Sequence, residues 1–249
     1  MESYLLWSDT HSTYRDQRAV DLALKIKHKR KQDRTIILGD FLDFYELSDY
    51  DRSPERKYTT GEELDYANEL LDAMGPVDVF LEGNHEYRLR KALANDKVSW
   101  GAYGHSVTSA LRLKDRGIRF VKYGHDIRVG PVLVSHDFGP AGKTAMQSAY
   151  NIVRYNIAFA HTHRMGVLYD GAYRGLDRDV IRHVVMTCGH LSDVHQADYM
   201  KPADKAGWQL GLGQILISKT GIATCIPLPF VKNKQKRYEC TVLGETFYA

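Results

Sequence analysis

The chain has 249 residues and a formal net charge of +3, with 43% hydrophobic and 26% charged residues. These ordinary globular values exclude wholesale disorder and a strongly polycationic protein. Its three scattered cysteines are too few for a disulfide framework or a cysteine zinc site, so we expect reduced, packed thiols. There is no basic N-terminal segment before a long apolar run, and no stretch approaches the ~20 apolar residues that cross a bilayer. The sequence therefore predicts a soluble cytoplasmic protein with no membrane partner.

The first half of the chain alternates strand-like and helix-like segments. Apolar residues at helical spacing predict helices over residues 19–26 and 64–74, and Gly75-Pro76 ends the second one. A β-α-β-α-β order predicts right-handed crossovers and a largely parallel sheet. Short apolar runs place its buried strands at residues 4–7, 35–38 and 77–81.

Beyond about residue 117 the pattern changes to mostly strands. One clear helix is predicted there, over residues 143–155. No repeat, low-complexity tract or linker-like segment interrupts the chain, which predicts one domain over residues 1–249. The strands of this half are predicted at residues 118–123, 132–135, 157–160, 180–187, 214–218 and 222–226.

Side chains that carry chemistry follow the predicted strands where each strand ends. Because the carboxyl ends of strands in an α/β sheet share one edge, we expect these side chains to lie together. Each segment alone has an ordinary alternative, such as a turn, a helix cap or a surface histidine pair. Five segments in the same context make coincidence a poor explanation. They are Asp9-Thr10-His11, Gly39-Asp40-Phe41-Leu42-Asp43, Gly83-Asn84-His85-Glu86, His136 and His161-Thr162-His163.

In this order the segments closely resemble the motifs of the calcineurin-like metallophosphoesterases, which are D-x-H, G-D-x-x-D, G-N-H-[DE], H and G-H-x-H. The resemblance spans residues 9–163, with Ala160 in place of the last motif's glycine. It implies a four-layer α/β/β/α sandwich with mixed sheets and a two-metal site. Residues 188–212 also resemble a stretch of phage-encoded members, which implies a phage or prophage origin and a bacterial or infected host cytoplasm. The implied ligands are Asp9, His11 and His163 for one ion, Asn84, His136 and His161 for the other, and Asp40 as the bridge.

Mixed carboxylate, imidazole and amide ligands suit transition-metal ions, here Mn²⁺ first, with Fe, Zn²⁺ or Ni²⁺ as alternatives. A bridging carboxylate can hold two cations about 3.5–4 Å apart, close enough to clamp a phosphate. The expected reaction is in-line attack on phosphorus by a metal-activated water or hydroxide. The resemblance implies that His85 protonates the leaving oxygen and that Asp43 orients its imidazole. The alternative reading of Asp43 is a helix N-cap.

Phe44 departs from the pattern of the superfamily's phosphoprotein phosphatases, which carry a phosphate-binding arginine at that position. This difference argues against phosphoprotein phosphatase activity. The replacement donors that the sequence offers are Arg88, Arg90 and Arg164, which can equally be surface charges. His190 and His195 are the remaining histidines that we expect nearest the site.

The predicted function is a dinuclear metal-dependent phosphoesterase acting on phosphate mono- or diesters, with nucleotides or nucleic acid as the favoured substrate class. Substrate choice is expected to lie in loops at 44–61, 87–117 and 189–209. The alternative is a catalytically silent scaffold of the same fold, which would usually lose ligands or the GNH histidine. A zinc hydrolase acting on C–N or C–O bonds is a third class. Basic runs at 27–34 and 232–237 are either nucleic-acid contacts or solvated charges, and the oligomeric state stays open.

Overall fold

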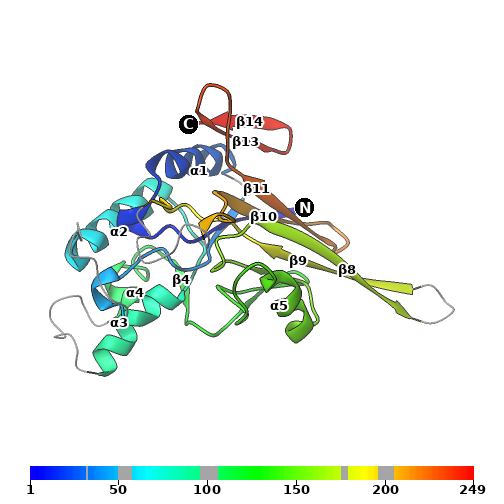
Figure 1. The fold of residues 1–249 in the computed structure, drawn as a ribbon, viewed down its shortest axis with the longest axis horizontal. Coiled ribbons are helices and arrows are strands. Elements are labelled where there is room, and N and C mark those ends of the chain that lie inside the picture. The colour runs from blue at the N-terminus through cyan, green and yellow to red at the C-terminus, as the bar shows by residue number, and fades with distance from the viewer. Residues whose placement is uncertain (32, 50–57, 96–105, 175–178, 196–204) are drawn as a thin grey trace.

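The computed structural model describes residues 1–31, 33–49, 58–95, 106–174, 179–195 and 205–249. Two mixed β-sheets lie at its centre, and helices cover their outer faces (Figure 1). Within the described residues, none of the helices combines the length and the apolar character that a membrane span needs.

The first sheet has six strands in the order β11-β10-β1-β2-β3-β4. Its parallel half is formed by the predicted β-α-β-α-β segment and continues into β4, and β10 and β11 add antiparallel strands on the other side of β1. The strands are β1 (Glu2–Trp7), β2 (Arg34–Ile37), β3 (Val79–Leu81), β4 (Arg119–Val121), β10 (Gly211–Ile217) and β11 (Ala223–Pro229). The connecting helices are α1 (Gln17–Lys29) and α2 (Thr60–Met74).

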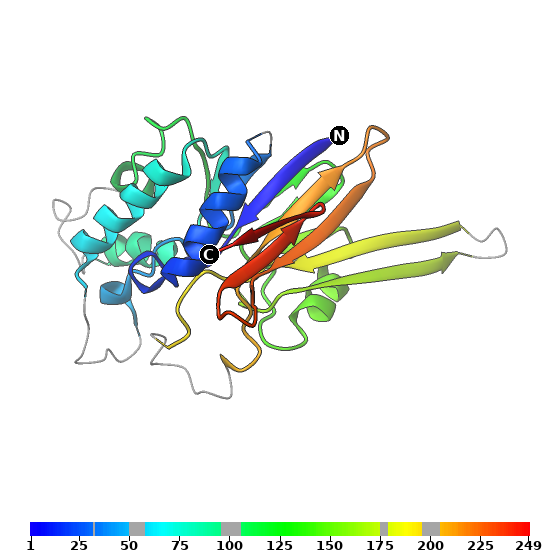
Figure 2. The ribbon, with the colours of Figure 1, turned by 90° about the horizontal axis from the view of Figure 1, so that it is seen from above.

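The second sheet has five strands in the order β5-β6-β7-β9-β8. β6, β7 and β9 are parallel, and β5 and β8 are antiparallel edge strands. β8 and β9 form a long hairpin that extends away from the other strands (Figure 2). The elements are β5 (Ile127–Val129), β6 (Val132–Val134), β7 (Ile157–Phe159), β8 (Gly166–Arg174), β9 (Asp179–Thr187) and the helix α5 (Ala145–Val153).

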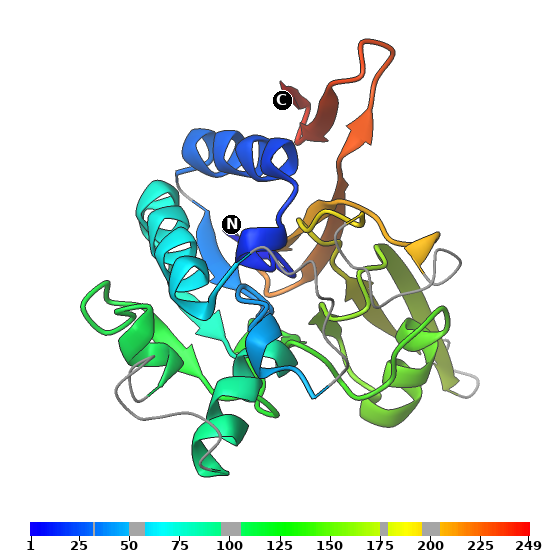
Figure 3. The ribbon, with the colours of Figure 1, turned by 60° about the vertical axis from the view of Figure 1, so that its left-hand side comes forward.

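Alternating side chains of the strands build three apolar layers. In β1, Leu5 and Trp7 pack with α1 and α2, whereas Leu6 faces the second sheet. In β7, Ala158 faces the first sheet and Phe159 packs under α5. The central strands of both sheets are thus buried on both faces, with α1 and α2 outside one sheet and α5 outside the other (Figure 3). The predicted four-layer α/β/β/α sandwich is confirmed.

The predicted strands and helices are all present, but other elements were not foreseen. The helix α3 (Asn84–Ala94) and the short helix α4 (Val107–Ala110) occupy part of the segment 87–117 that was predicted to be a loop, so that prediction is wrong for these residues. The buried positions Leu89, Ala92 and Leu93 carry the helical spacing that identifies α3.

A third, three-stranded sheet lies against α1 near the C-terminus (Figure 1). It consists of β12 (Val231–Lys232), β13 (Tyr238–Val242) and β14 (Glu245–Tyr248). The hydroxyl of Tyr238 donates to Asp16 at the start of α1 over 2.7 Å, and Lys25 Nζ donates to the carbonyl of Tyr248 over 2.9 Å. These bonds attach the small sheet to the first helix.

Candidate metal centre

The predicted ligands lie on tight turns at the ends of strands. Five of the seven have a positive φ, in the left-handed region that costs a non-glycine residue roughly 1–3 kcal/mol. Backbone hydrogen bonds between the turns oppose this strain: the amide of Asp9 donates to Gly39 over 3.2 Å, and that of His11 donates to Asp40 over 2.9 Å. Strained residues gathered in this way are typical of a functional site. They are Asp9, His11, Asp40, His161 and His163.

Two glycines allow the turns after β2 and β3 to touch. Gly39 has φ +93°, and a Cβ on it would stand 2.5 Å from the amide nitrogen of Gly83 and 2.9 Å from Nδ1 of His136. Neither contact is tolerable, and the first is to backbone that cannot rotate away. The G-D and G-N motifs therefore carry their glycines for backbone proximity.

We expect Gly39→Ala to lower the free energy of unfolding by about 2–4 kcal/mol, because it adds left-handed strain and a backbone clash. Urea unfolding followed by circular dichroism measures this change. Gly61→Ala is the matched control, because Gly61 lies in α2 with only Thr59 Oγ1, at 3.9 Å, near its Cβ position. That control should raise stability by about 0.5–1 kcal/mol. Equal effects of the two variants would contradict this explanation.

Asp9, His11 and His163 form one group of donors that could hold a metal ion. Nε2 of His11 and Nε2 of His163 face each other at 3.3 Å, and Oδ1 of Asp9 lies 3.6 Å from the latter. All three side chains are buried, and Asp9 Oδ1 has no hydrogen-bond partner among the described residues. Two facing imidazole nitrogens beside an unpaired buried carboxylate oxygen fit a divalent cation between them.

Asn84, His136 and His161 converge on the other side of Asp40. Oδ1 of Asn84 lies 2.8 Å from both His136 Nε2 and His161 Nδ1. Nδ1 of His136 donates to the carbonyl of Leu38 over 2.8 Å, which fixes the ring so that Nε2 is the nitrogen that faces Asn84 and Asp40. The second group is therefore oriented for ligation by an outer hydrogen bond.

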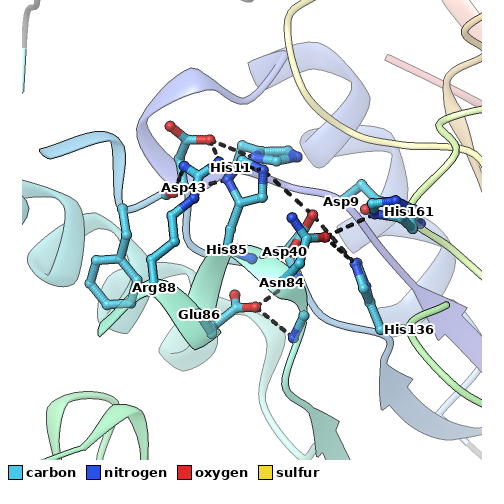
Figure 4. A network of polar contacts seen from close by, with 12 residues as sticks. Asp9, His11, Asp40, Asp43, Asn84, His85, Glu86, Arg88, His136 and His161 are labelled. Carbon is cyan, nitrogen blue, oxygen red and sulfur yellow. Dashed lines mark hydrogen bonds and ion pairs between the residues drawn. The ribbon is translucent and has the colours of Figure 1, made fainter. Parts of the chain in front are cut away.

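Asp40 lies between the two groups (Figure 4). Its Oδ2 is 3.5 Å from His136 Nε2 and 3.8 Å from His85 Nε2. Its Oδ1 accepts a hydrogen bond of 2.9 Å from the backbone amide of His85, which holds the carboxylate in place. This position is the one that a bridging carboxylate needs.

His85, Asp43 and Arg88 form a connected group beside the first set of donors (Figure 4). Oδ1 of Asp43 lies 2.9 Å from His85 Nδ1 and 2.8 Å from His11 Nδ1. Arg88 donates from Nη1 to the carbonyl of Asp43 over 3.0 Å, and its Nη2 is 3.2 Å from His85 Nε2. The Asp43 carboxylate thus contacts two imidazole rings. The N-cap of the following 3-10 helix η2 (Tyr45–Leu47) is Phe44. The alternative prediction that Asp43 is a helix N-cap is therefore wrong.

Burial and mutual charge shift the pKa values of the cluster. Burial raises the pKa of Asp9 to about 6. Burial acts in the same direction on Asp40 and Asp43, but the surrounding histidines hold the pKa of both carboxyls below the usual range. Burial opposes charge on His85, yet Asp40 and Asp43 raise its pKa to about 9. The cluster therefore places a cationic imidazole beside two anionic carboxylates at neutral pH.

Two buried glutamates support these turns, although the sequence alone assigns neither of them a role. Glu86 accepts hydrogen bonds from the backbone amides of Asp40, Leu42 and Gly83 over 2.9, 2.7 and 2.8 Å. Glu63 on α2 accepts from the amides of Asp43 and Phe44. Glu86 belongs to the G-N-H-[DE] motif, which is a usable signal, whereas nothing in the sequence around Glu63 distinguishes it from a surface helix residue.

His190 and Trp208 enclose the first group from outside. The ring of His190 is fully buried and stacks on His163 at 5.0 Å between centroids, and Trp208 meets His163 edge-on at 4.1 Å. The structure thus places His190 at the border of the site, as expected, whereas His195 is exposed. Enclosure by rings restricts the orientation of the His163 imidazole.

The three candidate phosphate-binding arginines lie in different surroundings. Arg88 lies at the site, as described, and Arg90 is held away from it by an ion pair of 2.6 Å with Glu82 and by the ring of Tyr87. Arg164 lines a cavity next to the His161–His163 turn.

The described part of the first basic run is largely taken up by structural contacts. Lys27 donates to the carbonyl of Pro76 over 2.6 Å, and Arg30 pairs with Asp33 at 2.5 Å. In the second run, Lys232 lies over the ring of Tyr238 and Arg237 over that of Tyr248. Contact of either run with nucleic acid stays a prediction.

No family profile and no curated protein matches this sequence. Among solved structures the chain is similar to Vps29 of Chaetomium thermophilum, with a TM-score of 0.49 and 12% identity over 99% of this chain and 97% of that one. YfcE, a phosphoesterase from E. coli, gives 0.39 and 15% over 90% and 98%. TT1561 of Thermus thermophilus gives 0.40 and 12% over 90% and 98%. These values are too low to transfer an activity from any of the three.

Proposed function

We propose that the chain is a dinuclear metal-dependent phosphoesterase that hydrolyses phosphate mono- or diesters. The observation that carries this proposal is the convergence around Asp40 of three donor groups, all buried except the half-buried His161, each with ligand atoms within 4.8 Å of one another. The five sequence motifs support membership of the calcineurin-like metallophosphoesterases, as one domain. The groups are Asp9-His11-His163, Asp40-His136-His161 and His11-Asp43-His85.

The donor chemistry fits two transition-metal ions. Asp9, His11 and His163 would hold one, Asn84, His136 and His161 the other, and Asp40 would bridge them. Two bound ions would lower the pKa of a water to make it a nucleophile and would neutralise charge on the phosphate. Oxygen and imidazole donors without a thiolate suit Mn²⁺ first, with Fe, Zn²⁺ or Ni²⁺ as alternatives.

Protein groups beside the donors are placed to handle the leaving group. His85 would donate a proton to the leaving oxygen, and Asp43 would hold that imidazole through the 2.9 Å contact to its Nδ1. Arg88 would fix the pair, because it contacts both the Asp43 carbonyl and His85. These three residues are the proposed proton-donating unit.

Nucleotides or nucleic acid are the proposed substrate class. Phe44 is fully buried, so the position where phosphoprotein phosphatases carry a phosphate-binding arginine faces the core.

A silent scaffold of the same fold would have no need for seven donors and a positioned imidazole. A cytoplasmic location remains part of the proposal because the three cysteines are free and buried. A phage-related origin remains part of it through the resemblance of residues 188–212 alone.

Metal-stripped protein refilled with Mn²⁺, Fe, Zn²⁺ or Ni²⁺ tests the proposal with bis-p-nitrophenyl phosphate and p-nitrophenyl phosphate as substrates. We expect turnover that depends on the metal, fastest with Mn²⁺, and the ratio of the two rates gives the diester or monoester preference. Folded protein that binds two ions and hydrolyses neither substrate would contradict the enzyme and favour the scaffold.

A further inference from the structure

A cavity of about 300 Å³ opens beside the proposed metal centre. It lies between the turn after β7, the start of α5 and the segment before β10, and Thr162, which separates the predicted ligands His161 and His163, is part of its wall. The cavity and the metal centre therefore share one turn of the chain. A volume of this size lies at the lower end of the range for small-molecule sites.

The walls of the cavity carry hydrogen-bond donors and positive charge. Lys143 and Arg164 line it, and so does Thr187, a residue that is 1% exposed and whose Oγ1 has no partner among the described residues. Gly142, with φ +84°, leads into α5, and the N-cap Thr144 makes no side-chain bond to the helix. Among the residues that the structure describes, those lining the cavity include no carboxylate. This combination suits an anion.

We propose that the cavity binds a second phosphate group of the substrate, one that is not hydrolysed. This inference rests on the proposed function, since the scissile phosphate must lie at the metal ions that His161 and His163 would hold, next to the cavity wall formed by Thr162. A nucleotide phosphorylated at both its 3′ and 5′ oxygens, or a nucleic-acid strand, carries such a neighbouring phosphate. Met146 and Met165 add an apolar wall against which a sugar can pack.

A substitution at Gly207 can test the contribution of Arg164 without changing the charge of the protein. A Cβ at this position would collide with the guanidinium of Arg164, so Gly207→Ala must move that group. Thr187→Val removes the unpartnered hydroxyl while keeping the shape of a buried strand residue, and Lys143→Gln removes one exposed charge. The three variants act on three different donors of the same cavity.

The experiment compares thymidine 5′-(p-nitrophenyl phosphate) with the same compound carrying a 3′-phosphate, using Mn²⁺-refilled protein. We expect the 3′-phosphate to raise kcat/KM at least about tenfold, and Lys143→Gln to remove most of that advantage. Thr187→Val and Gly207→Ala should each reduce it about three- to tenfold. Lys219→Gln, at an exposed position in the turn between β10 and β11, is the matched charge control and should leave the ratio unchanged.

Equal kcat/KM for the two substrates in the wild type, or an equal loss with Lys219→Gln, would overturn the inference and leave the proposed function standing. If neither substrate turns over, the proposed function fails, and calorimetric binding of thymidine 3′,5′-bisphosphate then decides on the cavity. Binding weakened about tenfold by Lys143→Gln, but not by Lys219→Gln, supports the phosphate site. Binding that Lys143→Gln does not weaken overturns it.

Discussion

Replacing Asp40 with Asn should lower Mn²⁺-dependent hydrolysis of bis-p-nitrophenyl phosphate by roughly 10³-fold. Asp40 is the carboxylate between the two donor groups, with Oδ2 facing His136 and Oδ1 held by the amide of His85. Asparagine keeps one oxygen but loses the charge and the second oxygen that a bridge requires. The expected cause of the loss is therefore incomplete metal binding rather than a change in fold.

Metal content measured by inductively coupled plasma mass spectrometry separates these causes. We expect two ions per wild-type chain and fewer in Asp40→Asn, with circular dichroism unchanged. Asp115→Asn makes the same chemical change at an exposed position and should alter neither metal content nor rate. Two tightly bound ions and a rate within about tenfold of wild type in Asp40→Asn would show that Asp40 is not the bridge.

The central strands could be predicted because their apolar runs are short and buried on both faces. The strands that were missed carry weaker apolar patterns and form by pairing with the next strand along the chain. β14 reads Glu-Thr-Phe-Tyr, with no apolar run, and it forms because β13 pairs with it in register, Cys240 opposite Phe247. α3 was missed because a polar, charged sequence hides its narrow apolar stripe. Local patterns cannot show what only tertiary packing decides.

The candidate site also contains some residues that the sequence predicts and others that it does not. Asp9, Asp40 and His136 could be predicted because side chains that follow strands of an α/β fold meet at a shared edge. Glu63 could not, because it reaches the Asp43 turn only through the packing of α2 on the first sheet. The cavity is built from four segments, at 142–146, 162–165, 187 and 207–209, of which only the second overlaps a motif. Its buried hydroxyl on Thr187 belongs to what the sequence shows only as an ordinary strand residue. The candidate metal ligands could be recognised in the sequence. The glutamates that support their turns and the neighbouring cavity are apparent only in the structure.

Replacing His85 with Asn should lower kcat for a thymidine dinucleotide by about 10²–10⁴-fold while both metal ions stay bound. The proposed role of His85 is to protonate the leaving oxygen, and the alkoxide that leaves a dinucleotide needs that proton. The nitrophenolate that leaves bis-p-nitrophenyl phosphate is stable without it, so there we expect a loss of only about tenfold. His125→Asn, at an exposed position, is the control and should change neither rate.

The difference between the two leaving groups tests the role of His85 more sharply than the loss itself. The backbone amide of His85 donates a 2.9 Å hydrogen bond to Asp40. If His85 only positioned Asp40, its replacement would lower the rates for both substrates equally and would change the metal content. That backbone bond survives the substitution, because it comes from the amide and not from the imidazole. Equal losses with both leaving groups would therefore contradict proton donation, whereas a loss confined to the alkoxide substrate would locate the proton on His85 at the moment the bond breaks.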